Sequence, residues 1–406
     1  MDEEAPPRGM GLPEGLELRP AREEEARDLA ELWSYAFPGE RSVDERVQEL
    51  DEGGTYGGLE TAWVCQGEEG RLGALRMYEL TLHLWGRAYR AMGLAAVAVE
   101  PGARRRGVGR WMCERALERA RTGGSVLSLL YPYRVSFYSR LGYTLAGELH
   151  RYRFSPAELP LFAERAHVER ADSSAAVEKV RALYDRVARE SNGLLVRPPG
   201  AWEFLEGGGT VTCLFRNSEG GAEGYMVVEP ARRMRHGRRE LRVREVVAES
   251  ADGYRGLLGW LSAQRGQWDR LVYDALPGEG LHRVLSHPER PGAPRTRGLW
   301  FESARILRGP MLRILDVEAL LGGGEGVNGD GALLAVRDPQ IPDNEGVWRA
   351  GTQGARKVQD KPGDGALPVS LATDLLVAGS LPGVPSPPEG WTPPLGVRDF
   401  RVLDSF

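Results

Sequence analysis

The stretch that decides the fold is PGARRRGVGRWM, residues 101–112, in which three consecutive arginines stand directly before a Gly-Val-Gly step. It follows AMGLAAVAVE, residues 91–100, an almost unbroken apolar run typical of a strand buried on both faces. It leads into GRWMCERALERARTGG, residues 109–124, where apolar residues recur at helical spacing and two glycines supply a stop. The sequence therefore predicts a strand, an arginine–glycine loop and a helix, in that order.

A loop in this position is a natural binding site for an anion. The first N–H groups of a helix have no partner within the helix, and the helix dipole favours negative charge there. Glycines let a phosphate approach the backbone, and arginines add forked donors. A solvated basic turn or a nucleic-acid patch is the plainer alternative, but the preceding strand and the following helix argue against it. The spacing Arg104-x-x-Gly107-x-Gly109 therefore indicates a phosphate-bearing ligand.

The bulk composition excludes several classes of function. The chain has 406 residues, which is too long for one ordinary core, and its formal net charge is -5. We therefore expect two or three domains and no global attraction to nucleic acid or anionic lipid. The sequence contains no run of about 18 apolar residues, so we expect no membrane span. The N-terminus lacks the apolar segment of a signal peptide.

The cysteines and histidines indicate neither a disulfide framework nor a metal site. The three cysteines show no CxxC spacing, which favours a reducing, cytoplasmic location. The six histidines show neither HxxxH nor HExxH spacing, so we expect no metal. The near absence of lysine beside abundant arginine suggests a GC-rich bacterial source.

The rest of the chain alternates between helical and strand patterns. Composition changes near residues 158 and 302 suggest domain boundaries. Helical periodicity is clearest at residues 22–36, 173–191 and 253–268. Strand patterns lie at residues 61–66, 71–86, 125–132, 210–215, 224–230 and 241–250.

Two motifs carry a resemblance to a known superfamily. Arg-x-x-Gly-x-Gly between a strand and a helix resembles the acyl-CoA pyrophosphate loop of the GCN5-related N-acetyltransferases, the GNAT superfamily. FYSRLGY, residues 137–143, resembles the aromatic–Tyr and Leu/Phe-Gly-Tyr/Phe landmark that follows in that superfamily. A closer similarity is to the Eis (enhanced intracellular survival) acetyltransferases. It is carried by residues 96–119, 137–143, 194–205, 243–261 and 305–321 and by the C-terminal phenylalanine.

The resemblance implies an α+β fold with two tandem GNAT-type mixed-sheet domains and a C-terminal sterol-carrier-protein-like α/β domain. We expect the catalytic domain at residues 1–158, a degenerate GNAT-like domain at residues 159–301 and the third domain at residues 302–406. The central domain has no second Arg-x-x-Gly-x-Gly, so we expect it to bind no CoA. The family also implies a homo-hexamer in which the C-terminus enters the catalytic domain.

The resemblance also implies acetyl-CoA as co-substrate and assigns roles to particular residues. Backbone groups of Val97 and Val99 would pair with the pantetheine arm, and Tyr138 would be the general acid. The free carboxylate of Phe406 would be the base; an α-carboxyl group has a pKa of about 3.3–3.7 and is a weak base unless burial raises it. The pyrophosphate would be held by Arg104, Arg105, Arg106, Gly107, Val108, Gly109 and Arg110.

The acceptor implied is a primary amine on a small molecule or a peptide. Some family members have Glu before the final Phe, whereas this chain has Ser405. This difference weakens the inference that the chain shares the aminoglycoside and polyamine substrates of the family. Candidate pocket residues are Trp33, Tyr35, Phe37 and Ser405. Two alternatives stay open. One is an acetyltransferase for peptide lysine or N-terminal amines, and the other is a non-catalytic acyl-CoA or lipid-binding protein.

Overall fold

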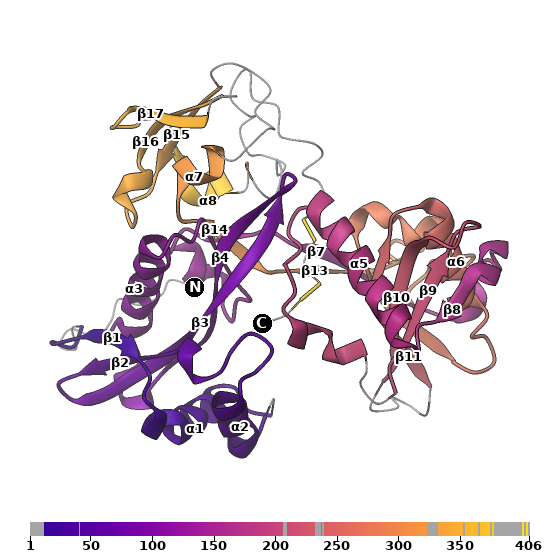
Figure 1. Ribbon diagram of the computed structural model, residues 1–406, viewed down its shortest axis with the longest axis horizontal. Helices are drawn as coiled ribbons and strands as arrows, with labels where there is room; N and C mark the ends of the chain where they lie inside the picture. Colours follow the sequence, from indigo (N-terminus) through magenta and orange to yellow (C-terminus); the bar gives the residue numbers. More distant parts are fainter. Residues whose placement is uncertain are drawn as a thin grey trace.

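The computed structural model describes residues 12–39, 41–205, 209–231, 237, 239–322, 332–351, 354–363, 366–373, 376, 400–401 and 403–404. Strands among these residues form two seven-stranded sheets and one four-stranded sheet, and Figure 1 shows the three sheets as separate parts of the molecule.

The first sheet is built around a parallel pair of strands joined by a helix. Its strand order is β1-β2-β3-β4-β5-β14-β6. Only β4 and β5 pair in parallel, and helix α3 (Val108–Thr122) connects them. The strand bounds are β1 Glu17–Pro20, β2 Ala62–Gly67, β3 Gly70–Leu84, β4 Arg87–Val99, β5 Leu127–Leu130, β14 Met311–Ile314 and β6 Thr144–Leu145.

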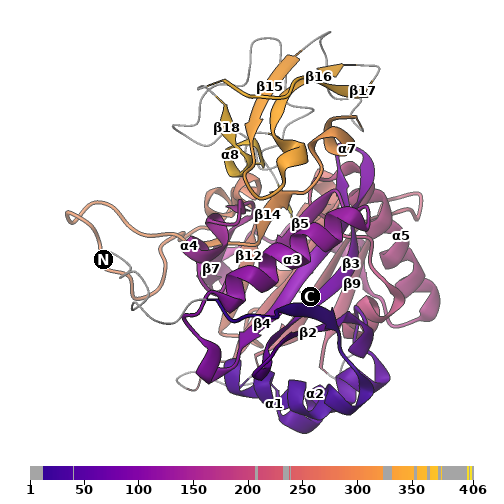
Figure 2. The ribbon, with the colours of Figure 1, turned by 90° about the vertical axis from the view of Figure 1, so that its left-hand side faces the viewer.

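Helices cover both faces of the first sheet. The apolar stripe of α3, including Met112 and Leu117, packs with Leu72 and Leu94 on one face, and α3 crosses that face in Figure 2. Helix α1 (Ala26–Ala36) packs against the opposite face, next to α2 (Val43–Glu52). The predicted strand–loop–helix unit is confirmed, and α3 ends at the expected glycine, Gly123.

The second sheet has the same plan, in which a helix joins a parallel pair of strands. Its order is β13-β7-β12-β11-β10-β9-β8, and the parallel pair β11 and β12 is joined by α6 (Ala251–Ser262). Helix α5 (Ser174–Glu190) covers the other face. The prediction of two mixed-sheet domains is thus confirmed. The strand bounds are β13 Arg305–Arg308, β7 Glu148–Phe154, β12 Arg270–Ala275, β11 Glu240–Ala248, β10 Ala222–Pro230, β9 Val211–Arg216 and β8 Val168–Arg170.

A smaller C-terminal sheet packs onto the first one. Its order is β17-β16-β15-β18, with helices α7 (Val317–Gly322) and α8 (Val369–Thr373) beside it. Leu334 and Trp348 of this sheet share one core with Leu82 of β3 and Ile314 of β14. Figure 1 shows it lying above the end of the first sheet. Its strands are β17 Gly354–Gln359, β16 Gly346–Gly351, β15 Ala332–Arg337 and β18 Leu367–Pro368.

The three cysteines are buried, and the remaining helical segments are short. Within the described ranges no helix is long and apolar enough to span a bilayer. Cys65, Cys113 and Cys213 are all buried free thiols, and burial raises the pKa of Cys113 to about 12, in keeping with a packing role. Helix α4 spans Val135–Ser139. Short 3-10 helices lie at Glu23–Glu25, Leu59–Thr61, Pro101–Ala103, Pro156–Glu158, Ala163–His167, Pro199–Leu205, Pro277–Glu279, Leu281–Arg283 and Pro342–Asn344.

Candidate active site

Strand β4 carries a bulge close to the predicted anion loop. Leu75 of β3 faces two residues of β4, Ala96 and Val97, because the register shifts between Ala74 and Arg76. Ala96 adopts φ of +49°, and its carbonyl accepts a hydrogen bond from the indole of Trp33 at 2.7 Å. A bulge bends the strand and increases its local twist. Trp33 is 2% exposed, so its side chain holds this bend and belongs to the core.

Beyond the bulge, β4 parts from β5. The parallel pairing ends at Gly93 and Leu129, whereas β4 runs on to Val99. In the described sheet, the edge of β4 that faces β5 therefore has no partner strand over residues 94–99. An extended ligand can pair with such an edge as an added strand. Val97 and Val99, predicted to meet the pantetheine arm, lie on this segment and are half-buried.

The loop between β4 and α3 leaves the start of the helix open. Gly107 is the N-cap of α3 with φ of +86°, a conformation that favours glycine, and no side chain caps the helix. Gly109 sits against β4, since an added Cβ would lie 3.3 Å from Val99 Cγ2. Val108 places its side chain in the core. The first N–H groups of α3 are therefore available to an anion.

The three arginines of this loop and Arg110 in the first turn of α3 differ in exposure and in their ion-pair partners. Arg104, Arg105 and Arg110 are exposed. Arg104 donates to the Val99 carbonyl at 3.1 Å, and its guanidinium lies 5.3 Å from the ring centre of Tyr35. Tyr35 is itself exposed beside the loop.

Two of the four arginines have carboxylate partners. Arg106 makes a forked ion pair with Glu69, with contacts of 2.8 and 3.0 Å, and Arg110 pairs with Glu114 at 2.8 Å. Ion pairs at the surface contribute little and exchange readily. Arg104 and Arg105 are therefore the arginines best placed to meet a pyrophosphate, and Arg110 is available at the cost of its pair with Glu114.

Arg105→Gly is expected to raise the Kd for acetyl-CoA about tenfold, which corresponds to about 1.4 kcal/mol of binding free energy. The Tm should not fall. Arg105 has φ of +61°, where a side chain is strained and glycine is not, so the substitution removes charge without disturbing the backbone. Titration calorimetry with acetyl-CoA measures the Kd. Arg115→Gln on the following helix α3 is the control; this exposed arginine pairs with Glu118, and the variant should bind acetyl-CoA normally.

Tyr138 lies in helix α4 with its ring buried and 8% of the residue exposed. Edge-to-face contacts with Phe137 and Tyr143, at ring distances of 4.9 and 6.0 Å, fix the ring. Burial raises the pKa of Tyr138 well above its ordinary value, so the phenol stays protonated at neutral pH. Its hydroxyl makes no hydrogen bond within the described part of the chain. A protonated phenol can serve as a general acid.

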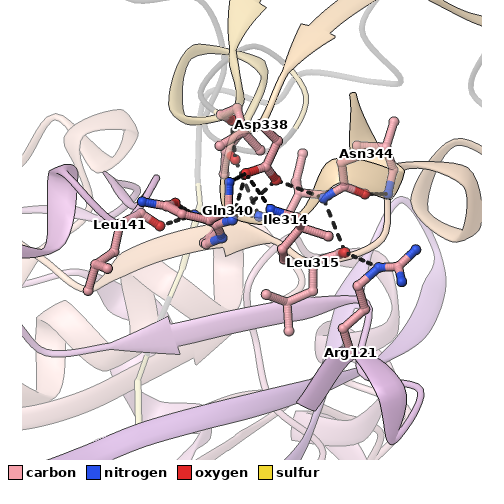
Figure 3. Close-up of polar contacts among 12 residues, drawn as sticks. Arg121, Leu141, Ile314, Leu315, Asp338, Gln340 and Asn344 are labelled. Atoms are coloured by element: carbon pink, nitrogen blue, oxygen red, sulfur yellow. Dashed lines mark hydrogen bonds and ion pairs between the residues drawn. The ribbon is translucent and has the colours of Figure 1, made fainter. Parts of the chain in front are cut away.

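The turn after Tyr138 is held by residues that the sequence did not single out (Figure 3). Arg313 of β14, fully buried, donates to the carbonyl of Leu141 and pairs with both carboxylate oxygens of Asp338 at 2.9 and 3.1 Å. Figure 3 shows Leu141, Gln340 and Asp338 around this contact. Gln340 donates to the Arg140 carbonyl at 2.6 Å. The C-terminal part of the chain therefore fixes the backbone that follows the proposed acid.

Gly142 of the FYSRLGY motif is required at this contact. Its φ is +82°, and a Cβ added there would lie 2.2 Å from Arg313 Nη1 and 2.7 Å from Val369 Cγ1. The motif glycine was the only sequence signal of this contact, because Arg313 and Asp338 lie about two hundred residues further along the chain.

The C-terminal segment returns to the point where β4 and β5 part. Phe400 is buried, and the Arg401 N–H donates to the carbonyl of Asn192 at 2.8 Å. The hydroxyl of Tyr131, the residue directly after β5, donates to the backbone carbonyl of Asp404 at 2.7 Å. Ser405 and Phe406 lie outside the described residues. Two residues of chain span at most about 7 Å.

Two adjoining pockets open on the side of α2. The first, of about 440 Å³, is lined by Arg41 and by four carboxylates, Glu45, Glu49, Glu52 and Glu203. The second, of about 270 Å³, shares Thr55, Gly200 and Glu203 with the first. It reaches Leu403 and Asp404 of the C-terminal segment. The side chain of Phe37 is half-buried against the core near α1 and lines neither pocket.

The second domain offers no comparable anion site at the equivalent helix. Only Glu249 and Ser250 separate β11 from α6, whereas eight residues separate β4 from α3. The Ser250 side chain caps α6 by accepting from the Gly253 N–H at 3.0 Å, and it donates to Glu223 at 2.7 Å. Asp252 adds a further acidic residue in the first turn. A phosphate would meet a satisfied helix end surrounded by carboxylates.

Sequence comparison identifies the class of protein. Residues 17–146 and residues 193–314 each match a sequence model of an acetyltransferase (GNAT) domain. The chain is a GNAT N-acetyltransferase with two such domains, as the resemblance predicted. No curated protein matches it.

Solved structures with the same fold extend over most of the chain. A GCN5-related N-acetyltransferase from Anabaena variabilis has 19% identity and a TM-score of 0.73, and covers 89% of both chains. One from Kribbella flavida has 23% identity and a TM-score of 0.70, over 90% of this chain and 89% of the other. Eis1 from Mycobacterium abscessus has 21% identity and a TM-score of 0.69, over 88% of both.

Proposed function

We propose that this chain transfers the acetyl group of acetyl-CoA to a primary amine in its first domain. The observation that carries the proposal is the open, arginine-flanked start of α3 beside the unpartnered edge of β4. The residues fit acetyl-CoA because the loop offers unpaired N–H groups and exposed guanidiniums to a pyrophosphate. The edge of β4 offers backbone groups to the pantetheine amides.

The chain's own residues then supply three roles. Bound acetyl-CoA provides an activated thioester, whose C–S bond breaks as the C–N bond to the amine forms. Tyr138 donates its proton to the departing sulfur, and its buried, fixed ring holds that proton in place. The bend at Ala96, held by Trp33, sets the backbone that positions the thioester.

We assign the base to the terminal carboxylate of Phe406, which would take a proton from the acceptor's ammonium group so that the neutral amine can attack the thioester. Tyr131 holds the Asp404 backbone at the end of β5, and two residues of extended chain reach at most about 7 Å from that anchor. The Asp404 side chain does not take this role, because it is buried against Arg197 at 2.8 Å.

We propose that the acceptor carries several amines, as aminoglycosides and polyamines do. In the lining of the first pocket beside α2, Glu49 is paired with Arg41 and Arg76, so Glu45, Glu52 and Glu203 supply the acidic lining that suits a polycation. This acidic lining supplies negative charge that Ser405 does not. Ser405 itself lies outside the described residues.

Release of CoA thiol across a panel of amines tests the proposed function. Aminoglycosides and polyamines should be acetylated faster than simple monoamines or lysine peptides, and the acceptor KM should rise with salt because screening weakens attraction to the pocket. Glu203→Gln should raise the acceptor KM, whereas Glu219→Gln, on an exposed turn of the second domain, should not. Preference for lysine peptides would favour a protein acetyltransferase. If no amine in the panel raises CoA-thiol release above the background rate, catalysis is refuted.

We also propose the remaining family features for this chain. The catalytic, degenerate and C-terminal domains would span residues 1–158, 159–301 and 302–406, with β7, β13 and β14 contributed to the neighbouring sheets. The four-stranded sheet with α7 and α8 would be the sterol-carrier-like domain. The protein would act in a bacterial cytoplasm as a homo-hexamer.

A further inference from the structure

A buried cluster of charges lies under the C-terminal segment, in the second domain. Arg197 makes a forked pair with Glu245, with contacts of 3.0 and 2.5 Å, and its Nε donates to Asp404 Oδ1 at 2.8 Å. The three side chains are 1%, 3% and 9% exposed. Two carboxylates therefore share one guanidinium away from water.

Aromatic residues hold this cluster in one arrangement. The Arg197 guanidinium lies 4.0 Å from the ring centre of Tyr184 and 4.7 Å from that of Trp202, so both rings restrict its position. The Tyr184 hydroxyl lies 3.2 Å from Asp404 Oδ2. Tyr225 donates to Glu245. Asp404 therefore binds a guanidinium whose position is already fixed by aromatic rings and by Glu245.

Stability of the domain alone does not explain the second carboxylate. Glu245 already neutralises Arg197 with the bidentate geometry that a guanidinium prefers. Adding Asp404 buries an extra charge, and burial raises the pKa of that carboxyl group. Buried ionic groups of this kind are best explained where they fix one conformation.

Asp404 is also the residue at which the two domains meet the tail. Its side chain is bound by Arg197 of the second domain, while its backbone carbonyl is bound by Tyr131 of the first. Because both the side chain and the backbone carbonyl of Asp404 are bound, its rotation is restricted as well as its position. Phe406, the proposed base, follows two residues later along the sequence.

We propose that the Arg197–Asp404 contact is a latch that positions the terminal carboxylate, and that Arg197 and Glu245 of the second domain are positioning residues for the reaction in the first. The inference rests on the proposed function for its catalytic meaning, but the latch itself is a physical contact that can be tested without turnover. It gives the second GNAT domain a role that requires no ligand of its own.

Asp404→Asn tests the latch while preserving the fold. Asparagine keeps the shape of the side chain and leaves the Arg197–Glu245 pair intact, so no charge is left unpaired. Native protein is treated with carboxypeptidase Y, and release of the terminal phenylalanine is followed by mass spectrometry. We expect release to be about tenfold faster, since cleavage tracks the population of the open tail. Arg197→Lys, which keeps the charge and loses the fork, should act in the same direction.

Glu249→Gln is the matched control. It removes a partly exposed ion pair with Arg186 at 2.9 Å in the same domain and should leave the release rate unchanged. Release of Phe406 at the wild-type rate from both latch variants would overturn the latch. Faster release with Tm lowered by more than a few degrees would also overturn it, because the tail would then open through general unfolding.

Steady-state kinetics separate the latch from the proposed base. If both hold, Asp404→Asn lowers kcat about tenfold and leaves the acetyl-CoA KM unchanged, because the base is displaced while the coenzyme loop is intact. If the tail opens faster but kcat is unchanged, the latch stands as a contact and the positioning role is refuted. Truncation of Phe406 tests the base independently of these variants.

Discussion

Tyr138→Phe is expected to lower kcat for acetyl transfer by about 10²–10⁴-fold, the range that a positioned general acid supplies. The substitution removes one hydroxyl and keeps the ring that packs against Phe137 and Tyr143. Because that hydroxyl makes no hydrogen bond within the described structure, stability should not change. Steady-state kinetics with a saturating amine measure the effect.

The pH dependence provides the second check on Tyr138. Burial raises the pKa of this phenol, and the protonated form is the active one, so kcat should not fall on the alkaline side up to about pH 9. Tyr143→Phe is the control, since its hydroxyl is already engaged with Ser128 at 2.6 Å. Loss of activity in Tyr143→Phe alone, with Tyr138→Phe fully active, would assign the acid elsewhere.

Displacing the terminal carboxylate should lower kcat by a similar factor, about 10²–10⁴-fold. Deletion of Phe406 moves the carboxylate back by one residue and removes the phenyl group. Extension by Gly-Ser keeps the phenyl group and moves the carboxylate forward by two residues. Acetyl-CoA affinity should be unchanged in both variants, because the loop before α3 is untouched.

The two tail variants together isolate the carboxylate from the side chain. Loss in both, measured by CoA-thiol release, supports the carboxylate as base. Loss only on deletion would show that the phenyl group matters through packing. Activity within twofold of the intact chain in both variants would place the base on another residue.

Local patterns predicted the centre of the first domain. The apolar run before residue 100, the glycines at 107 and 109 and the stripe of α3 are all short-range signals, and β4, the open loop and α3 follow them. The helices α1, α5 and α6 were found in the same way from their periodicity. Each depends on residues within a few turns of one another.

Long-range pairing could not be predicted in this way. Strand β14 joins β5 and β6 from a point far along the chain, and β7 pairs with β12 of the second sheet. Any apolar strand satisfies the local pattern, and only the packed structure selects its neighbour. The contacts of Arg313 with Leu141 and of Arg197 with Asp404 arise from the same non-local pairing.

We propose the loop between β4 and α3 as the acyl-CoA site of this chain. Titration calorimetry of the intact protein with acetyl-CoA tests it most directly. We predict one molecule bound per chain, with affinity weakened by Arg105→Gly and unaffected by Arg115→Gln. Binding of two molecules per chain would contradict this assignment and indicate a site in the second domain. So would binding of one molecule whose Kd is unchanged by Arg105→Gly.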